Sequence, residues 1–571
     1  MWRKLCAILQ FPGLMFGLTL VGAGAVLFWP ALRAPFVLDD YLQASMAHQA
    51  YPVPRAAWNL YDYINPSDAS VLRDRGFLPW WSDEALRIRF LRPLPSLALW
   101  CEYRLGASAW AMHLHSFAWW ALGAKLAHKL YSAHVSPRAA RIAVLVFALA
   151  PFQVVPIAWL ANREALISVA LCTFALSLQL KRTPTTRHFL FSTAAFAVAF
   201  SSGEYALAAC GYVAADAWIH TPGWTARLGR VAPAAIPAAM YLALRARLGY
   251  GAGGSGFYTD PFHTPGAFLA RAPERFARLW LDAWAGLDGE QLKSHVPTWV
   301  VVGLLAALGI LLRTALTAPY RDPKLRVFFL GSALSLLPFL AVVPSPRVLG
   351  LAMLGIALVV ARILENAWWP PPHSTYTRAP QAHLAALFLG FSHLIHGPAS
   401  SWLMARSWSN AGRAFERNAH ALSADLARAG GSVESADVTA LRGIAGAFFV
   451  PFALSPQGVP PRAWRLLSQA GHVLVRRTGE RELELVAAAD QSLVPIGPGN
   501  LFRPEGKGFQ RGQQFETPGM RVTVTEVSSA GVRRAKVQFA RMGDTQWMVE
   551  SSDGFLLIDL PDLGFGLPLE L

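Results

Sequence analysis

Residues 13–32, G-L-M-F-G-L-T-L-V-G-A-G-A-V-L-F-W-P-A-L, contain no charged side chain and are followed at once by R-A-P-F-V-L-D-D-Y-L-Q, residues 33–43. Crossing the hydrocarbon of a bilayer takes about 20 mostly apolar residues in a helix. The first stretch therefore predicts a membrane-spanning helix, and the second places Asp39 and Asp40 just beyond its end. A cleaved signal peptide is the alternative, but the stretch is long and lacks a convincing small-residue cleavage site.

The whole chain has the composition of a polytopic membrane protein. Of its 571 residues, 54% are hydrophobic and 15% are charged, which is too apolar for an ordinary soluble protein of this length. Ten further apolar stretches bring the prediction to about eleven transmembrane helices. The predicted segments are 13–32, 109–131, 140–158, 166–180, 188–202, 205–219, 231–244, 296–312, 327–343, 348–361 and 381–396.

The basic residues of the short loops predict the orientation of these helices. With Met1 in the cytoplasm, the inner segments hold 17 Lys and Arg against two acids, Asp322 and Glu365. These inner segments are 1–4, 125–141, 181–187, 220–230, 313–326 and 362–380. The net charge of +16 is then mostly a topology signal. Because the charge is spread over small loops rather than gathered on one face, we predict no binding of nucleic acid.

This topology divides the chain into a transmembrane domain, residues 1–397, and an exported domain, residues 398–571. The transmembrane domain carries two outer loops, residues 33–108 and 249–295. In the exported domain, alternating runs such as M-R-V-T-V-T-E-V, residues 520–527, predict strands. We expect a soluble α/β domain with a mainly antiparallel sheet and a structural or docking role.

Motifs for phosphate loops and metals are missing. The Gly-rich run at residues 249–256 lacks the G-K-[ST] ending of a P-loop, so we expect a flexible loop there. The four cysteines show no C-x-x-C spacing and imply neither a disulfide framework nor a zinc site. We predict no cofactor and no metal ligands, although two neighbouring acids could hold a divalent ion.

Ionisable residues near the ends of the predicted spans gather on the exported side. They are Asp39, Asp40, Arg163, Glu164, Glu204 and Arg347. Such groups are costly at a membrane boundary unless they are paired or hydrated, which makes them functional candidates. Repulsion between adjacent carboxylates can raise the pKa of one of them, as a general base near neutrality requires. The alternatives are an ordinary acidic turn, and helix-locking pairs of Arg163 with Glu204 or Arg347 with Glu164.

Several short motifs in order carry a resemblance to a known class. They are F-V-L-D-D-Y (36–41), R-P-L-P-S-L-A-L-W-C-E-Y-R-L-G (92–106), A-M-H-L-H-S-F (111–117), N-R-E-A-L-I (162–167), S-G-E-Y-A-L (202–207) and S-P-R-V-L-G-L-A-M-L-G (345–355). Over about residues 5 to 365 the chain resembles the GT-C class of membrane glycosyltransferases, in the branch of protein O-mannosyltransferases and aminoarabinose transferases. It departs from that branch at Gly203, where the family has a lysine, and at Met112, Ser116 and Val348.

The resemblance implies an integral protein of the bacterial inner membrane that moves a sugar from a polyprenyl-phosphate carrier to an acceptor hydroxyl on the outer face, with inversion. The acceptor would be a protein, a lipid or a polysaccharide. Asp39 or Asp40 would be the general base. Arginines would bind the donor phosphate and three further residues would orient the substrate. The arginines are Arg163, Arg347 and Arg92, and the orienting residues are Glu164, Glu204 and His113.

The rival predictions are a transporter and a non-catalytic membrane protein that binds lipid or glycan. A transporter typically shows inverted repeats and helices broken at the midplane. Neither pattern is visible in this sequence, and the charged residues gather at one face. The departure at Gly203 keeps a degenerate, non-catalytic relative open.

Overall fold

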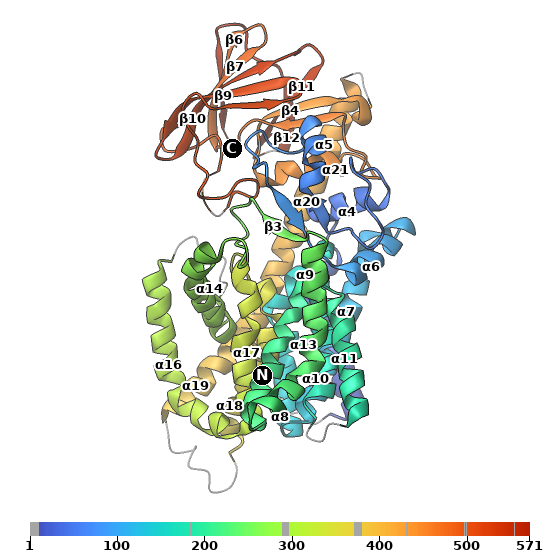
Figure 1. Ribbon diagram of the computed structural model, residues 1–571, viewed down its shortest axis with the longest axis vertical. Coiled ribbons are helices and arrows are strands. Elements are labelled where there is room, and N and C mark those ends of the chain that lie inside the picture. Colours follow the sequence, from blue (N-terminus) through green and yellow to red (C-terminus); the bar gives the residue numbers. More distant parts are fainter. Residues whose placement is uncertain are drawn as a thin grey trace.

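The computed structural model describes residues 11–181, 185–287, 296–370, 380–429, 432–495, 497, 499–552 and 554–570. The molecule is elongated, with a helical body at one end and β-sheets at the other (Figure 1). The last third of the chain forms most of the sheet layer.

Helices form at the segments that the sequence predicts to be apolar spans. Their bounds are α2 (Gly13–Leu27), α3 (Trp29–Leu32), α4 (Asp39–Ala47), α5 (Ala69–Asp74), α6 (Pro93–Arg104), α7 (Ala109–Ser132), α8 (Pro137–Ala148), α9 (Val154–Ala158), α10 (Glu164–Gln179), α11 (Thr186–Phe200), α12 (Ala209–His220), α13 (Trp224–Arg247), α14 (Pro265–Ala285), α16 (Thr298–Arg321), α17 (Pro323–Ser335), α18 (Gly350–Trp368), α19 (Pro380–Phe391), α20 (Gly397–Arg428) and α21 (Val450–Ala453). Short 3₁₀ turns that matter below are η2 (Pro151–Gln153), η3 (Leu160–Asn162), η4 (Glu204–Ala208) and η6 (Pro346–Val348).

The predicted count of about eleven membrane spans is not confirmed. Among the described residues, four helices are long and apolar enough to cross a membrane, at Leu160–Gln179, Thr298–Thr317, Pro323–Ala341 and Gly350–Trp368. A fifth span is added if Pro137–Ala148 and Pro151–Ala158, which are bent by 52°, count as one. Other predicted spans form helices of only 12 to 15 residues, such as α12 and α11.

The outer surface of the helical body is apolar. Large hydrophobic side chains on several peripheral helices are exposed, among them Leu14, Phe191, Trp299, Ile310 and Leu387. A soluble monomer rarely exposes so much apolar surface, whereas the hydrocarbon of a bilayer solvates such a surface well. We therefore treat the helical body as the membrane-spanning part of the protein.

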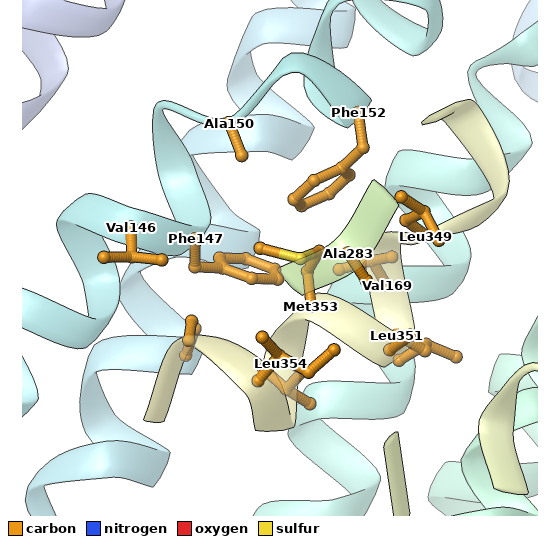
Figure 2. Packing of buried hydrophobic residues seen from close by; sticks show 14 of the residues in the cluster. Val146, Phe147, Ala150, Phe152, Val169, Ala283, Leu349, Leu351, Met353 and Leu354 are labelled. Atoms are coloured by element: carbon orange, nitrogen blue, oxygen red, sulfur yellow. The ribbon is translucent and has the colours of Figure 1, made fainter. Parts of the chain in front are cut away.

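A dense apolar core lies behind the break between α8 and α9. Phe147 at the end of α8 and Phe152 in η2 pack with Met353 and Leu349 at the start of α18 (Figure 2). All four side chains are buried. This packing fixes the bend after α8, and the bend in turn positions η3 and the first residue of α10.

Three sheets lie at the other end of the molecule. The strands are β1 (Asp62–Ile64), β2 (Arg87–Arg89), β3 (Gly251–Gly253), β4 (Asp437–Arg442), β5 (Ala463–Leu466), β6 (His472–Gly479), β7 (Glu482–Ala487), β8 (Gln514–Thr517), β9 (Met520–Ser528), β10 (Gly531–Phe539), β11 (Thr545–Ser551), β12 (Gly554–Ile558) and β13 (Gly566–Glu570). The six-stranded sheet, β13-β6-β7-β10-β9-β8, is antiparallel throughout. The four-stranded sheet, β12-β11-β4-β5, contains two parallel pairs, β11 with β4 and β4 with β5. The third sheet, β1-β2-β3, joins the two outer loops.

Helix α20 connects the two ends of the molecule. It contacts α3 and α9 in the helical body and β12 in the four-stranded sheet. The chain is helical without a break from α19 through a π-turn at Ser392–His396 into α20. The predicted boundary at residue 397 therefore falls inside a continuous helical run, and the division into two domains stays a prediction.

The first outer loop packs into the C-terminal sheets. Trp80 donates from Nε1 to the carbonyl of Leu467 at 2.9 Å, and the amide of Trp464 donates to the carbonyl of Arg75 at 2.9 Å. Leu72, Trp81 and Leu86 of the loop belong to the same buried cluster as the apolar residues of the sheets. The loop and the C-terminal domain therefore share one hydrophobic core.

Candidate active site

The two adjacent aspartates have different surroundings. Asp40 is fully buried, and its two carboxylate oxygens accept from the amides of Val37 at 3.0 Å and Ala161 at 2.8 Å. Asp39, at the first position of α4, is only partly buried and makes no side-chain hydrogen bond to any residue that the structure describes. Asp40 thus ties the start of α4 to η3, while the carboxylate of Asp39 is left open to a ligand.

A strained residue precedes the pair. Leu38 has φ 47° and ψ −114°, a conformation that a bulky L residue rarely adopts and that costs about 1–3 kcal/mol. The hydrogen bond from Val37 to Asp40 spans this turn, and the one from Ala161 attaches it to η3. We read Asp40 as the group that stabilises the turn presenting Asp39.

Burial raises the pKa of both carboxyl groups. The pKa of Asp39 rises to about 7 because burial outweighs the attraction of Arg347 and Arg92. The pKa of Asp40 also rises to about 7, chiefly by burial, against the lowering effect of its backbone hydrogen bonds. Asp39 therefore combines an open carboxylate with a pKa near neutrality.

Arg92 links three segments beside Asp39. It caps α6 and pairs with Glu164 of α10 at 3.1 Å and with Glu204 of η4 at 3.4 Å. Arg245 at the end of α13 contacts the other oxygen of Glu204 at 3.4 Å. The rings of Tyr61 and Phe90 lie against the Arg92 guanidinium, with its carbon 4.9 and 4.6 Å from their centroids. The result is a row of alternating charges rather than a single ion pair.

Gly203 makes room for Arg92. Gly203 has φ +118°, and a Cβ at this position would lie 2.6 Å from the Cγ of Arg92. Such a distance is far below van der Waals contact. The position where the resembling family carries a lysine is thus packed against an arginine from another segment, which supplies positive charge to the same place.

Arg163 lies in a separate, closed group. Its guanidinium pairs with Glu102 of α6 and donates to Ser116 Oγ at 2.8 Å and to the carbonyl of Met112 at 2.6 Å. The side chain is completely buried. Every nitrogen of its guanidinium has a partner within the protein, so the group is arranged to lock α6, α7 and α10 together. This geometry runs against the predicted contact with donor phosphate.

His113 is also turned into the helical body. The ring is fully buried and its Nδ1 lies 2.8 Å from the carbonyl of Ile157. The contact packs α7 against α9. Its Nε2 is buried and has no hydrogen-bond partner among the described residues, and the substrate-orienting role of His113 stays a prediction.

Both of the helix-locking pairs considered from the sequence are wrong. Glu204 pairs with Arg92 and Arg245 instead of Arg163, and the partner of Glu164 is Arg92 instead of Arg347. One carboxylate oxygen of Glu164, Oε2, is buried and has no hydrogen-bond partner among the described residues.

Arg347 lines an apolar cavity of about 860 Å³. It belongs to η6, makes no ion pair with any residue that the structure describes, and lies over the ring of Trp159 at 5.2 Å. The cavity walls come from α9, α14, α20 and the second outer loop, with apolar residues such as Val155, Leu403 and Trp408. The same wall also contains Asp282 and His396, and Arg347 makes no ion pair with either of them.

Sequence reasoning missed four contributors. Glu102 stands in a quoted motif but received no role, although it neutralises Arg163. Arg245 directly follows a predicted span on the exported side, a signal that could have identified it. Trp159 and Tyr258 carry no comparable signal. Tyr258 belongs to the second outer loop, which only folding brings to the site, where its ring packs on Phe90 with centroids 5.6 Å apart.

Throughout the described ranges, no group of three or more His, Cys, Asp or Glu side chains is placed to hold a metal ion.

Comparison with known proteins gives distant structural neighbours. No protein-family model and no curated protein matches the chain. ArnT from Cupriavidus metallidurans, solved in the apo state, is similar with a TM-score of 0.39 and 14% identity, over 76% of this chain and 84% of that one. The Archaeoglobus fulgidus oligosaccharyltransferase with a tethered acceptor peptide has a TM-score of 0.39 and 12% identity, over 79% of this chain and 63% of its own.

The same archaeal enzyme, AglB, in complex with an inhibitory peptide and a dolichol-phosphate, also gives a TM-score of 0.39, with 13% identity. The chain spans less than two thirds of the length of this archaeal protein. These neighbours are an aminoarabinose transferase and an oligosaccharyltransferase, both of the GT-C class, as the sequence resemblance predicts. A likeness this loose carries no weight for the chemistry of the site.

Proposed function

We propose that the protein transfers a sugar from a polyprenyl-phosphate-linked donor to an acceptor hydroxyl on the outer face of the membrane, with inversion at the anomeric carbon. The observation that carries the proposal is the contrast at the aspartate pair. Asp39 has an open carboxylate and a pKa of about 7, and the charge of Arg347, which lines the cavity of about 860 Å³, acts on this carboxylate.

Asp39 is the general base in this proposal. A base works best when its pKa lies near the operating pH and when its carboxylate can reach the proton that it takes. Asp40 meets the first condition but not the second, because both of its oxygens already accept from backbone amides. Asp40 is therefore a positioning residue for Asp39.

Arg347 binds the phosphate of the donor. A polyprenyl chain needs an apolar space and its phosphate needs fixed cationic donors, and the 860 Å³ cavity offers both at one place. Arg92 is held between two carboxylates, so it adjusts the charge around Asp39 rather than gripping a phosphate. Arg163 has a structural role.

The reaction is a single displacement. The acceptor hydroxyl oxygen forms a bond to the anomeric carbon and gives its proton to Asp39. The bond from that carbon to the phosphate oxygen breaks, and its electron pair stays on the leaving lipid phosphate. Arg347 stabilises the charge that develops on this oxygen. The unpartnered Oε2 of Glu164 is suited to a hydroxyl of the sugar.

The direct test is transfer from labelled polyprenyl-phosphate sugar in membranes that carry the protein or its Asp39→Asn variant. We expect transfer by the unmodified protein and a loss of about 10²–10⁴-fold in the variant. Asp74→Asn, an exposed acid of the same outer loop, is the matched control and should retain full activity. Full activity of Asp39→Asn would contradict the assignment of the base.

The rival function is a non-catalytic protein that holds a lipid. The unpaired Arg347 in an apolar cavity fits this function equally well. Binding of a polyprenyl-phosphate sugar by the unmodified protein, without turnover against protein, lipid or polysaccharide acceptors, would favour it and overturn the transferase proposal.

A further inference from the structure

A second cavity lies at the opposite end of the helical body, away from the sheets. Its volume is about 1270 Å³. Its walls are the last turns of α7, α10 and α12 and the first turns of α11, α13 and α17. These turns meet at the end of the body that lies far from the C-terminal sheets (Figure 1). It shares no lining residue with the cavity around Arg347.

The wall of this cavity carries unneutralised positive charge. Lys129, Lys181 and Lys324 line it and make no ion pair within the described ranges. The two acids of the wall are already engaged. Asp216 pairs with Arg230 at 2.6 Å and with His220 at 3.0 Å, and Asp322 accepts from the backbone amide of Lys324 at 2.9 Å. The lysines are therefore available to an anion from outside the chain.

The start of one helix adds to the positive potential. Thr185 caps α11 in the wall of the cavity, whereas the carboxylate of Asp322 already occupies the start of α17. The first turn of a helix presents partial positive charge, which favours an anion nearby. Lys129 lies on α7, Lys324 on α17 and Lys181 just after the end of α10, so the charge converges on the cavity from several sides.

The same wall is partly apolar. Leu130, Leu180, Phe189 and Phe328 line it next to the lysines. Inorganic phosphate gains nothing from an apolar wall, because it has no apolar group to place there. A lipid can place its phosphate among the lysines and its first methylene groups on the apolar part. Basic pockets between transmembrane helices are a physical solution for holding anionic headgroups.

We propose that this cavity binds the phosphate-bearing headgroup of an anionic membrane lipid. The site does not depend on the proposed transferase function, because it shares no residue with the group around Asp39. It lies on the side that the distribution of Lys and Arg predicts to be cytoplasmic. Its occupant would tie the ends of six helices together from the leaflet opposite the candidate active site.

The test measures binding of phosphatidylglycerol to the full-length purified protein by native mass spectrometry in detergent, with phosphatidylcholine as the neutral reference. The variant is the triple change Lys129→Gln, Lys181→Gln, Lys324→Gln. We expect its affinity for phosphatidylglycerol to fall on the order of a hundredfold, since each lysine near a headgroup contributes about a factor of five. Binding of phosphatidylcholine should not change.

The matched control removes three charges near the same end but outside the cavity, by Lys125→Gln, Arg187→Gln and Arg313→Gln. It should bind phosphatidylglycerol within about twofold of the unmodified protein, because it leaves the cavity intact. An equal loss in the two triple variants would assign the binding to surface charge and overturn the proposal. Failure of the unmodified protein to prefer phosphatidylglycerol over phosphatidylcholine would also overturn it.

A competition arm separates the lipid from free phosphate. Inorganic phosphate at the concentration of the lipid headgroup should leave phosphatidylglycerol bound, because it cannot use the apolar wall. Displacement at that concentration would assign the site to soluble phosphate instead. The substituted lysines are partly or fully exposed, so both triple variants should unfold at the same temperature as the unmodified protein.

Discussion

The closed group around Arg163 and the cavity around Arg347 show two opposite uses of an arginine near one aspartate pair. Arg163 is completely buried and every nitrogen of its guanidinium has a partner on α6 or α7. Arg347 lies on a ring of Trp159 and faces an apolar cavity without a carboxylate partner among the described residues. The same contrast separates Asp40, which is saturated with hydrogen bonds, from Asp39, which is open. Saturated groups hold the fold, and unsaturated groups are available to a substrate.

The largest effect should come from the open carboxylate. Asp39→Asn keeps the shape of the side chain but cannot take a proton, so we expect transfer to fall by about 10²–10⁴-fold while binding of the lipid donor is retained. Radiolabelled transfer and donor binding, measured on the same membranes, would separate the two. A parallel loss of donor binding would mean that Asp39 holds the donor rather than the proton.

Substitution in the closed group around Arg163 should lower the stability of the protein rather than act directly on transfer. Arg163→Gln leaves Glu102 without its cation inside the protein, and breaking a buried pair costs about 3–5 kcal/mol. The readout is thermal unfolding in detergent, with Arg104→Gln, an exposed arginine of the same α6, as the control. A large loss of activity with unchanged unfolding temperature would place Arg163 in the reaction and break the comparison.

Arg347→Gln should slow the departure of the lipid phosphate without unfolding the protein. Removing one preorganised donor to a developing oxyanion costs about 10²–10³-fold in turnover. Arg347→Lys should recover part of this loss, because it keeps the charge but not the planar guanidinium. Arg406→Gln, on the exposed side of α20, is the control. Unchanged turnover in Arg347→Gln would remove this residue from the site.

A smaller effect is expected at Gly203. Gly203→Ala puts a Cβ 2.6 Å from the Cγ of Arg92 at φ +118°, so the backbone strain of about 1–3 kcal/mol adds to a displaced arginine. We expect reduced thermal stability and a shift in the pH at which activity appears, since Arg92 lowers the pKa of Asp39. Gly266→Ala, where an added Cβ meets nothing within 4 Å, is the matched control.

The smallest expected effect is the pH dependence of transfer and of stability that follows from the raised pKa of Asp39. With a pKa of about 7, Asp39 is protonated and inactive as a base in acid, so transfer should fall about tenfold per unit below pH 7 and reach a plateau above it. Stability should change in the opposite direction. The folded chain binds protons to Asp39 and Asp40 more tightly than the unfolded chain between about pH 4 and 7, so raising the pH through that window lowers the free energy of unfolding. Activity independent of pH in this range would contradict the assigned base.

The charge asymmetry of the loops predicts that Asp39, Glu164 and Glu204 lie on one side of the membrane. In the structure Arg92 pairs with both glutamates and its charge acts on Asp39. The side of the membrane stays a prediction. The pairing could not be predicted. Arg92 reaches Glu204 only because Gly203 leaves space, a fact about two segments 111 residues apart in the chain.

The predicted number of membrane spans is not confirmed, for a related reason. Hydropathy measures how apolar a stretch is, not how long its helix becomes. The stretch at 205–219 begins with the 3₁₀ turn η4 and leaves only 12 residues for α12. Proline at residue 151 breaks another stretch into two helices at 52°. The apolar stretches do form helices, but the backbone uses part of each stretch for turns that carry site residues.

The core shared by the first outer loop and the C-terminal sheets has a consequence for biosynthesis. Leu86 and Phe555 belong to one cluster, so about 470 further residues must be synthesised after the loop before its apolar partners exist. At about 5–20 residues per second that interval lasts roughly 25 to 95 seconds. During this time Trp80, Trp81 and their neighbours lack the apolar partners that bury them in the folded protein. A chain truncated before its last sheets would keep these side chains exposed.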